Sequence, residues 1–113
     1  MLPKRLKDRS LYLQIVSKLD KKLRITKGYW HRITSIKHPS IRGKEQQVRE
    51  ALQDPDSIRQ SKTDENVFLY YKQYKSYYLC VVARHKNGNG FIITVYTTNK
   101  IKEGRLIWQK KQR

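Results

Sequence analysis

The clearest alternation of apolar and polar side chains lies near the C-terminus, in the segment GFIITVYTTNK at residues 90–100. Side chains of a strand point alternately to its two faces. Phe91, Ile93 and Val95 therefore predict an apolar face. The opposite face is predicted to be rich in hydroxyls and to bear Ile92, Thr94, Tyr96 and Thr98, followed by Lys100. Such a row is either an ordinary solvated face or a surface that holds a ligand.

The remaining strands are predicted by the same alternation or by a high content of β-branched and aromatic residues. They lie at residues 11–16, 22–26, 57–61, 65–73 and 77–85, with a short edge strand at 106–108. The sequence Asn87-Gly-Asn-Gly90 predicts a tight hairpin turn between the strands at 77–85 and 91–98.

Two helices are predicted between these groups of strands. Thr26 is a good N-cap, and the apolar stripe that follows it consists of Tyr29, Trp30, Ile33 and Ile36. His38-Pro39 ends this helix, because the residue before a proline is pushed out of the α region. A second helix at residues 43–53 has a stripe of Val48, Ala51 and Leu52.

This order of elements predicts an α+β fold. An N-terminal hairpin and two helices are expected to pack on a four-stranded antiparallel sheet formed by the later strands. One domain is expected to span residues 1–113, because no linker, repeat or low-complexity segment interrupts the chain. Residues 1–10 and 109–113 are expected to be basic, flexible tails.

Charge is the strongest global signal in the sequence. Lys and Arg number 26 against 9 Asp and Glu, which gives a net charge of +17. Such a field attracts polyanions. Nucleic acid is the leading partner, and an anionic membrane or an acidic protein are the others. Solubility alone needs a net charge of only about 2–8, so the excess calls for a further reason.

Several classes of protein are disfavoured. The longest apolar run, at residues 77–83, is far shorter than the roughly 20 residues of a spanning helix, and no signal peptide is expected. Cys80 is the single cysteine, so no internal disulfide forms and a cytoplasmic location is expected. Phosphate-binding glycine loops, nucleophile elbows and zinc spacings are missing from the sequence, so we expect neither a cofactor nor a metal.

The side chains that remain for chemistry suffice for metal-free cleavage of RNA. A base removes the 2′-hydroxyl proton, an acid protonates the leaving 5′-oxygen, and cations stabilise the phosphate. His38 titrates in the useful range and has a defined place at a helix end. The alternative is a histidine that only caps its own helix, and sequence spacing alone favours that alternative.

Polar candidates form rows along the predicted strands: Arg59 with Ser61, Tyr70 with Lys72, Arg84 with Cys80, and Thr94 with Tyr96 and Thr98. A meander can bring such rows together on one sheet face. Guanidinium and hydroxyl groups there would bind phosphate oxygens, and tyrosine rings would stack on bases. The alternative is a set of cross-strand pairs on a solvated face. The coincidence of all the rows with the high charge favours a binding surface.

Three longer motifs are W..I..IKHPSI.GKE..V...L.DPD.IR.S, LYYK and GFIITVYTTNKIKEG..IW. From about Leu23 to Trp108 the chain thereby resembles small cyanobacterial and phage-associated proteins of the barnase–EndoU–colicin–RelE nuclease superfamily. The resemblance implies a helical N-terminal part, a four-stranded antiparallel sheet as the active face, and metal-independent endoribonuclease activity. It also implies, in many members, a toxin role with a neutralising partner.

Carried over by position, the resemblance makes His38 the helical histidine. Arg59 and Ser61 match the polar pair of the first sheet strand, and Lys72 and Arg84 match the basic strand positions. Thr94, Tyr96 and Thr98 match the hydroxyls of the final strand.

The leading hypothesis is therefore a toxin-like endoribonuclease that leaves a 2′,3′-cyclic phosphate. Its expected catalytic residues are His38, Arg59, Lys72, Arg84, Thr94 and Tyr96. Its expected substrate-binding residues are Ser61, Tyr70, Thr98 and Lys100. A second hypothesis is a non-catalytic module that binds nucleic acid. A third is a basic protein that docks an acidic partner, such as an antitoxin or immunity protein.

Overall fold

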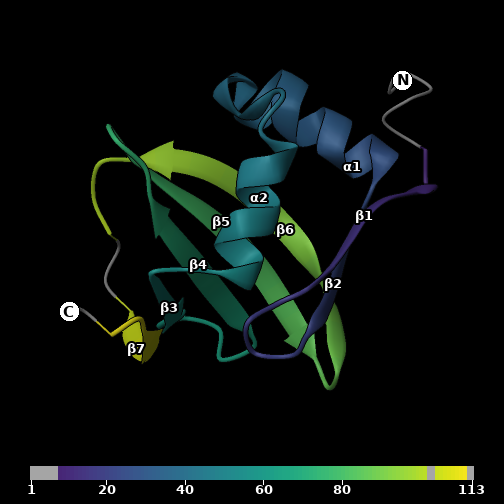
Figure 1. Ribbon diagram of the computed structural model, residues 1–113. Helices are drawn as coiled ribbons and strands as arrows, with labels where there is room; N and C mark the ends of the chain where they lie inside the picture. The colour runs from purple at the N-terminus through teal and green to yellow at the C-terminus, as the bar shows by residue number, and fades with distance from the viewer. Residues whose placement is uncertain (1–7, 102–103, 112–113) are drawn as a thin grey trace.

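The computed structural model describes residues 8–101 and 104–111 of the chain. Within that part of the chain, seven strands form one sheet in the order β1-β2-β6-β5-β4-β3-β7 (Figure 1). The strands are β1 Leu11–Val16, β2 Lys22–Thr26, β3 Ser57–Gln60, β4 Val67–Gln73, β5 Tyr78–Lys86, β6 Asn89–Thr98 and β7 Arg105–Gln109. All pairs are antiparallel except β2 with β6, which are parallel.

The expected fold, a hairpin and two helices on a four-stranded antiparallel sheet, is wrong. The N-terminal hairpin is part of the sheet, because Lys22, Leu23 and Arg24 of β2 pair with the start of β6. At the other edge β7 pairs with β3 and adds a seventh strand. The structure is therefore dominated by a mixed sheet, and in the described residues its two α-helices are short.

Helix α1, Lys27–Arg32, begins where the sequence predicts. Thr26 is its N-cap, and the Thr26 side chain accepts a hydrogen bond of 3.1 Å from the Tyr29 backbone N–H. The chain then widens into a π-helical turn, Ile33–Lys37, which ends at His38. Pro39 cannot continue the turn, and a short 3₁₀ turn, Pro39–Ile41, follows.

Helix α2, Glu45–Gln53, packs on one face of the sheet over β4 and β5 (Figure 1). Its predicted stripe of Val48, Ala51 and Leu52 is fully buried. These side chains join Leu79 and Val81 of β5 in the main hydrophobic core. Burying a side chain such as Leu52 contributes about 1.5–3 kcal/mol, so this layer supplies much of the stability.

Strand β6 differs from the predicted alternation, which placed Ile93 rather than Ile92 with the core residues. The register of β5 and β6 shifts, so that Val82 pairs with Thr94 but the next residue, Ala83, pairs with Ile92. Ile93 is the extra residue of this β-bulge. Ile92 and Val95 are consequently both buried in the core.

The two ends of the chain are described in part. Residues 1–7 and 112–113 of the expected tails lie outside the described residues. Two residues of the expected N-terminal tail are hydrogen-bonded to the start of α1. The carbonyl of Asp8 accepts a bond of 2.8 Å from the N–H of Gly28, and the carbonyl of Ser10 accepts one of 2.8 Å from the N–H of Lys27. Gln109, expected in the other tail, is the last residue of β7. None of the helices that the structure describes is long and apolar enough to cross a membrane.

Candidate functional site

The face of β3–β6 opposite α2 carries four of the predicted site residues. Alternation along the strands and the cross-strand register place Arg59, Tyr71, Arg84, Thr94 and Tyr96 on this side, which we call the hydroxyl face. Because of the bulge, this face also carries Phe91 in place of Ile92. The alternation in the sequence therefore identified most residues of this face. The alternation predicted for β6 is wrong only at the start of that strand, before the bulge.

Tyr96 lies on the hydroxyl face, toward the C-terminal end of β6. It pairs with Cys80, which in turn pairs with Tyr71, and the side chains of Cys80 and Tyr71 are fully buried. Burial, followed by the neighbouring Cys80 and Tyr71 side chains, raises the pKa of the Tyr96 phenol. Tyr96 is therefore neutral at pH 7, and its hydroxyl is buried beside Cys80 and Tyr71.

His38 reaches the same end of the face from the helical side of the chain. The centroids of the His38 and Tyr96 rings are 5.8 Å apart, with an interplanar angle of 38°. Burial, and then the charge of Lys37, lowers the pKa of His38 below its ordinary 6.5. The imidazole is therefore neutral at pH 7, which is the form that a general base requires.

The position of His38 follows from the local backbone. Its N–H donates a hydrogen bond of 2.7 Å to the carbonyl of Ile33, five residues earlier, which closes the π-helical turn. The 3₁₀ turn after it packs against β6. Beyond Phe91 no described strand pairs with this edge of β6, so His38 lies beside an open sheet edge.

Thr94 lies two residues before Tyr96 on the hydroxyl face. Its Oγ1 is buried and has no hydrogen-bond partner in the described residues. A buried hydroxyl without a partner costs about 1–3 kcal/mol, and a ligand oxygen that bonds to it would recover that cost. His38, Tyr96 and Thr94 therefore form the chemically most promising cluster of the face.

The arginines of the hydroxyl face already have protein contacts. Arg59 Nη1 donates a hydrogen bond of 3.0 Å to the carbonyl of Gly104, while its Nε is buried without a partner in the described residues. Arg84 forms an ion pair of 2.5 Å with Asp64. Arg59 is also three strands away from Thr94 in the same row, about 14 Å at the usual strand spacing. The arginines therefore flank the cluster and do not enclose it.

Lys72 and Tyr70 lie on the other face of the sheet, against the helices, so the structure does not bring them together with His38. Lys72 Nζ donates hydrogen bonds to the carbonyl of Asp54 at 2.8 Å and to its Oδ2 at 3.2 Å, which fixes the end of α2. Tyr70 pairs with Ile58 of β3, which is a core residue, so Tyr70 and Lys72 lie on the core face of β4. The face is decided by the pairing register of the strands, which the sequence does not reveal.

Three further candidates make local contacts in turns. Ser61 Oγ accepts a hydrogen bond of 3.2 Å from the Thr63 backbone N–H, after the end of β3. Thr98 Oγ1 accepts a hydrogen bond of 3.1 Å from the N–H of Lys100 and donates another to its carbonyl. The Lys100 side chain is exposed. These contacts close turns at the rim of the hydroxyl face.

Tyr70 belongs to a buried polar network. Its hydroxyl donates a hydrogen bond of 2.9 Å to Ser17 Oγ and lies 2.8 Å from His85 Nε2. The His85 ring stacks on Phe68 with 4.0 Å between centroids. Burial, and then the charge of Lys21, lowers the pKa of His85 to about 4. This network joins β4 and β5 to the turn after β1 and has a structural role.

The buried His85 makes stability depend on pH. The unfolded chain takes up a proton on this residue below about pH 6.5, whereas the folded chain does so only near pH 4. The free energy of unfolding should therefore fall by about 3 kcal/mol on this account as the pH drops from 7 to 4. Urea unfolding of the wild-type protein and of His85→Phe at several pH values measures this. The variant keeps the ring stack and should show a shallower decline, and equal slopes would contradict the assignment.

Tyr71 and Cys80 lie on this face but were not among the predicted site residues. Cys80 appeared only as the single cysteine and in the row with Arg84, yet both side chains lie beside the Tyr96 hydroxyl. Alternation was the available signal. Tyr71 lies two residues from Leu69 on β4, and Cys80 lies two residues from Val82 on β5, so each pair shares a face. In the described residues, no group of three or more His, Cys, Asp or Glu side chains is placed to hold a metal ion.

No family of known proteins, no curated protein and no solved structure matches this chain. Functional inference consequently rests on the arrangement of the side chains.

Proposed function

We propose that this protein is a metal-independent endoribonuclease whose chemistry takes place at the edge of β6, around His38, Tyr96 and Thr94. The observation that carries the proposal is the 5.8 Å approach of the His38 ring to the Tyr96 ring at an open sheet edge. The net charge of +17 supports a polyanionic substrate. The expected four-stranded fold gives no support, since the sheet is larger and mixed.

In this proposal His38 is the general base. It takes the proton of a ribose 2′-hydroxyl, whose oxygen forms a bond to the adjacent phosphorus. The bond to the 5′-oxygen then breaks, and that oxygen leaves with a proton from water. The hydroxyls of Thr94 and Tyr96 are buried in the structure, so this step requires that RNA binding makes them accessible. They then donate hydrogen bonds to the phosphate oxygens, where negative charge accumulates. The products are a 2′,3′-cyclic phosphate and a 5′-hydroxyl.

The flanking arginines support substrate binding more than catalysis. Arg59 keeps a buried Nε without a partner in the described residues, and it lies along the row that leads to Thr94. Arg84 has its Nη2 engaged by Asp64, which lowers its availability for phosphate. Lys72 has no part in this proposal, because it holds the end of α2 on the other face.

In this proposal the protein acts on RNA in the cytoplasm. A toxin-like role would require a neutralising partner, and an acidic antitoxin or immunity protein is complementary to the same charged surface. Masking His38 and Tyr96 would be sufficient for inhibition.

A non-catalytic nucleic-acid-binding module is the second candidate function. The observation that favours it is that Arg84 is paired with Asp64, and that Lys72 is paired with Asp54 on the other face of the sheet. Neither cation is therefore placed to stabilise a reacting phosphate beside His38. The same net charge serves binding alone, without an acid or base.

Incubation of the purified protein with single-stranded RNA in excess EDTA distinguishes the two functions. We expect cleavage that EDTA does not inhibit, with 2′,3′-cyclic phosphate termini identified by mass spectrometry. Intact RNA, together with binding that weakens steeply as the salt concentration rises, would instead favour the binding module.

A further inference from the structure

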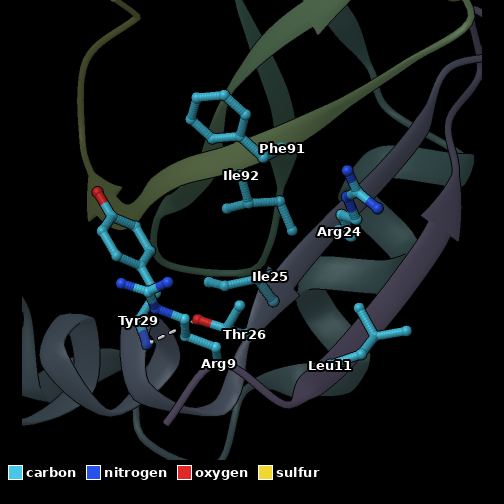
Figure 2. Close-up of a pocket in the computed structure, with 8 residues that line it drawn as sticks. All are labelled: Arg9, Leu11, Arg24, Ile25, Thr26, Tyr29, Phe91 and Ile92. Atoms are coloured by element: carbon cyan, nitrogen blue, oxygen red, sulfur yellow. Dashed lines mark hydrogen bonds between the residues drawn. The ribbon is translucent and has the colours of Figure 1, made fainter. Parts of the chain in front are cut away.

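A cavity of about 520 Å³ lies where β2 and β6 separate (Figure 2). The two strands pair in parallel only as far as Arg24 and Phe91, and β2 then leads into α1. The side chains of Ile25 and Ile92 follow this last pair and are almost completely buried, so they form the floor. The cavity is therefore a fork in the sheet with an apolar base, and it falls within the usual range of ligand sites, about 300–1,000 Å³.

Two aromatic rings flank this floor. Tyr29 of α1 and Phe91 of β6 both line the cavity, and Figure 2 shows the Phe91 ring above Ile92 and the Tyr29 ring to its left. Phe91 is 38% exposed, which is high for a phenylalanine next to a core. Flat apolar surfaces of this kind are the usual platforms for unpaired nucleic-acid bases.

Cations surround the same cavity. Arg9 and Arg24 line it, and the side chain of neither makes a hydrogen bond or an ion pair with any described residue. Lys37 Nζ lies 5.5 Å from the centroid of the Tyr29 ring, and Lys86 Nζ lies 5.5 Å from that of Phe91. No acidic residue is among the lining side chains. The charge at the mouth therefore has no partner within the described part of the protein.

We propose that this cavity binds one nucleotide of a single-stranded nucleic acid, with the base on the apolar floor between Tyr29 and Phe91 and the phosphate on Arg9 and Arg24. An apolar base alone would suit many small molecules, and free arginines alone would suit any anion. The two together select a ligand that joins a flat ring to a phosphate. A duplex is excluded, because its bases are stacked and paired inside the helix.

The cavity also lies on the strand that carries the proposed cleavage site. Phe91 and Tyr96 are five residues apart on β6, about 17 Å along the strand. One RNA strand can therefore occupy the cavity and reach His38 at the same time. The choice of RNA over DNA rests on the proposed function, whereas the binding of a nucleotide does not.

Titration calorimetry with adenosine 5′-monophosphate, adenosine and inorganic phosphate tests the cavity without relying on cleavage. We expect the wild-type protein to bind the nucleotide at one site and more tightly than either fragment. Phe91→Leu removes a ring while keeping an apolar side chain and should weaken binding at least about tenfold. Arg24→Gln should weaken binding of the nucleotide but not of adenosine.

Two variants serve as controls for this titration. Arg105→Gln removes one exposed charge at the other edge of the sheet and should bind as the wild type does. His38→Ala should also bind the nucleotide normally, because His38 does not line the cavity.

Two results would overturn the proposal: a wild-type protein that does not bind the nucleotide, or inorganic phosphate that binds as tightly as the nucleotide. Unchanged binding in both Phe91→Leu and Arg24→Gln would place any nucleotide elsewhere and overturn it as well. Nucleotide binding with no cleavage of RNA would support the cavity and refute the endoribonuclease function, so the two proposals fail separately.

Discussion

Replacing His38 with alanine is expected to lower the rate of RNA cleavage by about 100- to 10,000-fold, the usual contribution of a general base. The reason is that His38 is the only described histidine whose ring lies against Tyr96 of the hydroxyl face. Single-turnover cleavage of a short fluorescent RNA in EDTA measures this loss. Tyr96→Phe, which keeps the ring and removes the hydroxyl, should lower the same rate by a smaller factor.

His31→Ala is the matched control. His31 lies on α1 with its ring beside Ser35, so it is a histidine of the same helical segment without a contact to the sheet face that the structure records. This variant should cleave RNA at the wild-type rate. Equal rates for His38→Ala and the wild type, with both proteins folded, would remove the base from the proposed mechanism.

The pH dependence of cleavage gives a second readout for His38. Its pKa is lowered by burial and then by Lys37, so the neutral base persists below the ordinary pKa of 6.5. The cleavage rate should therefore decline only at a pH below 6.5, where the imidazole takes up a proton. A residual rate in His38→Ala should lack this decline.

Replacing Gly90 with alanine is expected to destabilise the protein by about 3 kcal/mol or more. Gly90 pairs with His85 in the β5–β6 ladder. A Cβ at this position would overlap the carbonyl oxygen of Arg84 and would lie 3.1 Å from the Cα of His85. Both contacts are backbone atoms of the neighbouring strand, so relief would require the ladder to separate. Urea unfolding monitored by tryptophan fluorescence measures the change.

Gly88→Ala is the control for this effect. Gly88 lies in the same hairpin, but a Cβ there would have no atom within 4 Å. The free energy of unfolding should change by less than about 1 kcal/mol. Because domains of this kind are stable by only about 5–15 kcal/mol, the two variants should be easily separated. Equal stabilities for the two variants would contradict the close approach of β5 and β6 at Gly90.

Local structure was predictable from the sequence because it depends on neighbouring residues. Thr26 caps α1 since a threonine oxygen reaches the N–H three residues later. His38 ends the helical segment since Pro39 follows it. The stripe of Val48, Ala51 and Leu52 on α2 and the hairpin turn after Lys86 depend on equally short-range rules.

The phase of β6 was not predictable. Ile92, Ile93 and Val95 are all suited to a core, and simple alternation chose Ile93. The structure instead buries Ile92 and Val95 and accommodates the extra residue in a bulge. A bulge of one residue leaves no compositional signal, so the sequence could not show which isoleucine turns away or that Phe91 reaches the cavity.

The candidate site was predictable in part, as far as it depends on alternation within single strands. Arg59, Arg84, Thr94 and Tyr96 do share a face, because each strand alternates regularly near them. Lys72 was misplaced, since the pairing register of β4 puts it on the face of the helices. The approach of His38 to Tyr96 depends on how the 3₁₀ turn packs on β6, which no spacing in the sequence reveals.

By itself, the sequence determined the strands, the helix ends, the charge of +17 and the residue types available for chemistry. Only the tertiary structure decided that β2 pairs with β6, that seven strands share one sheet in the described part of the chain, and that a cavity opens between them. The physical reason is range. Caps, turns and alternation are set by contacts a few residues apart, whereas pairing between Arg24 and Phe91 is chosen by the packing of the whole core.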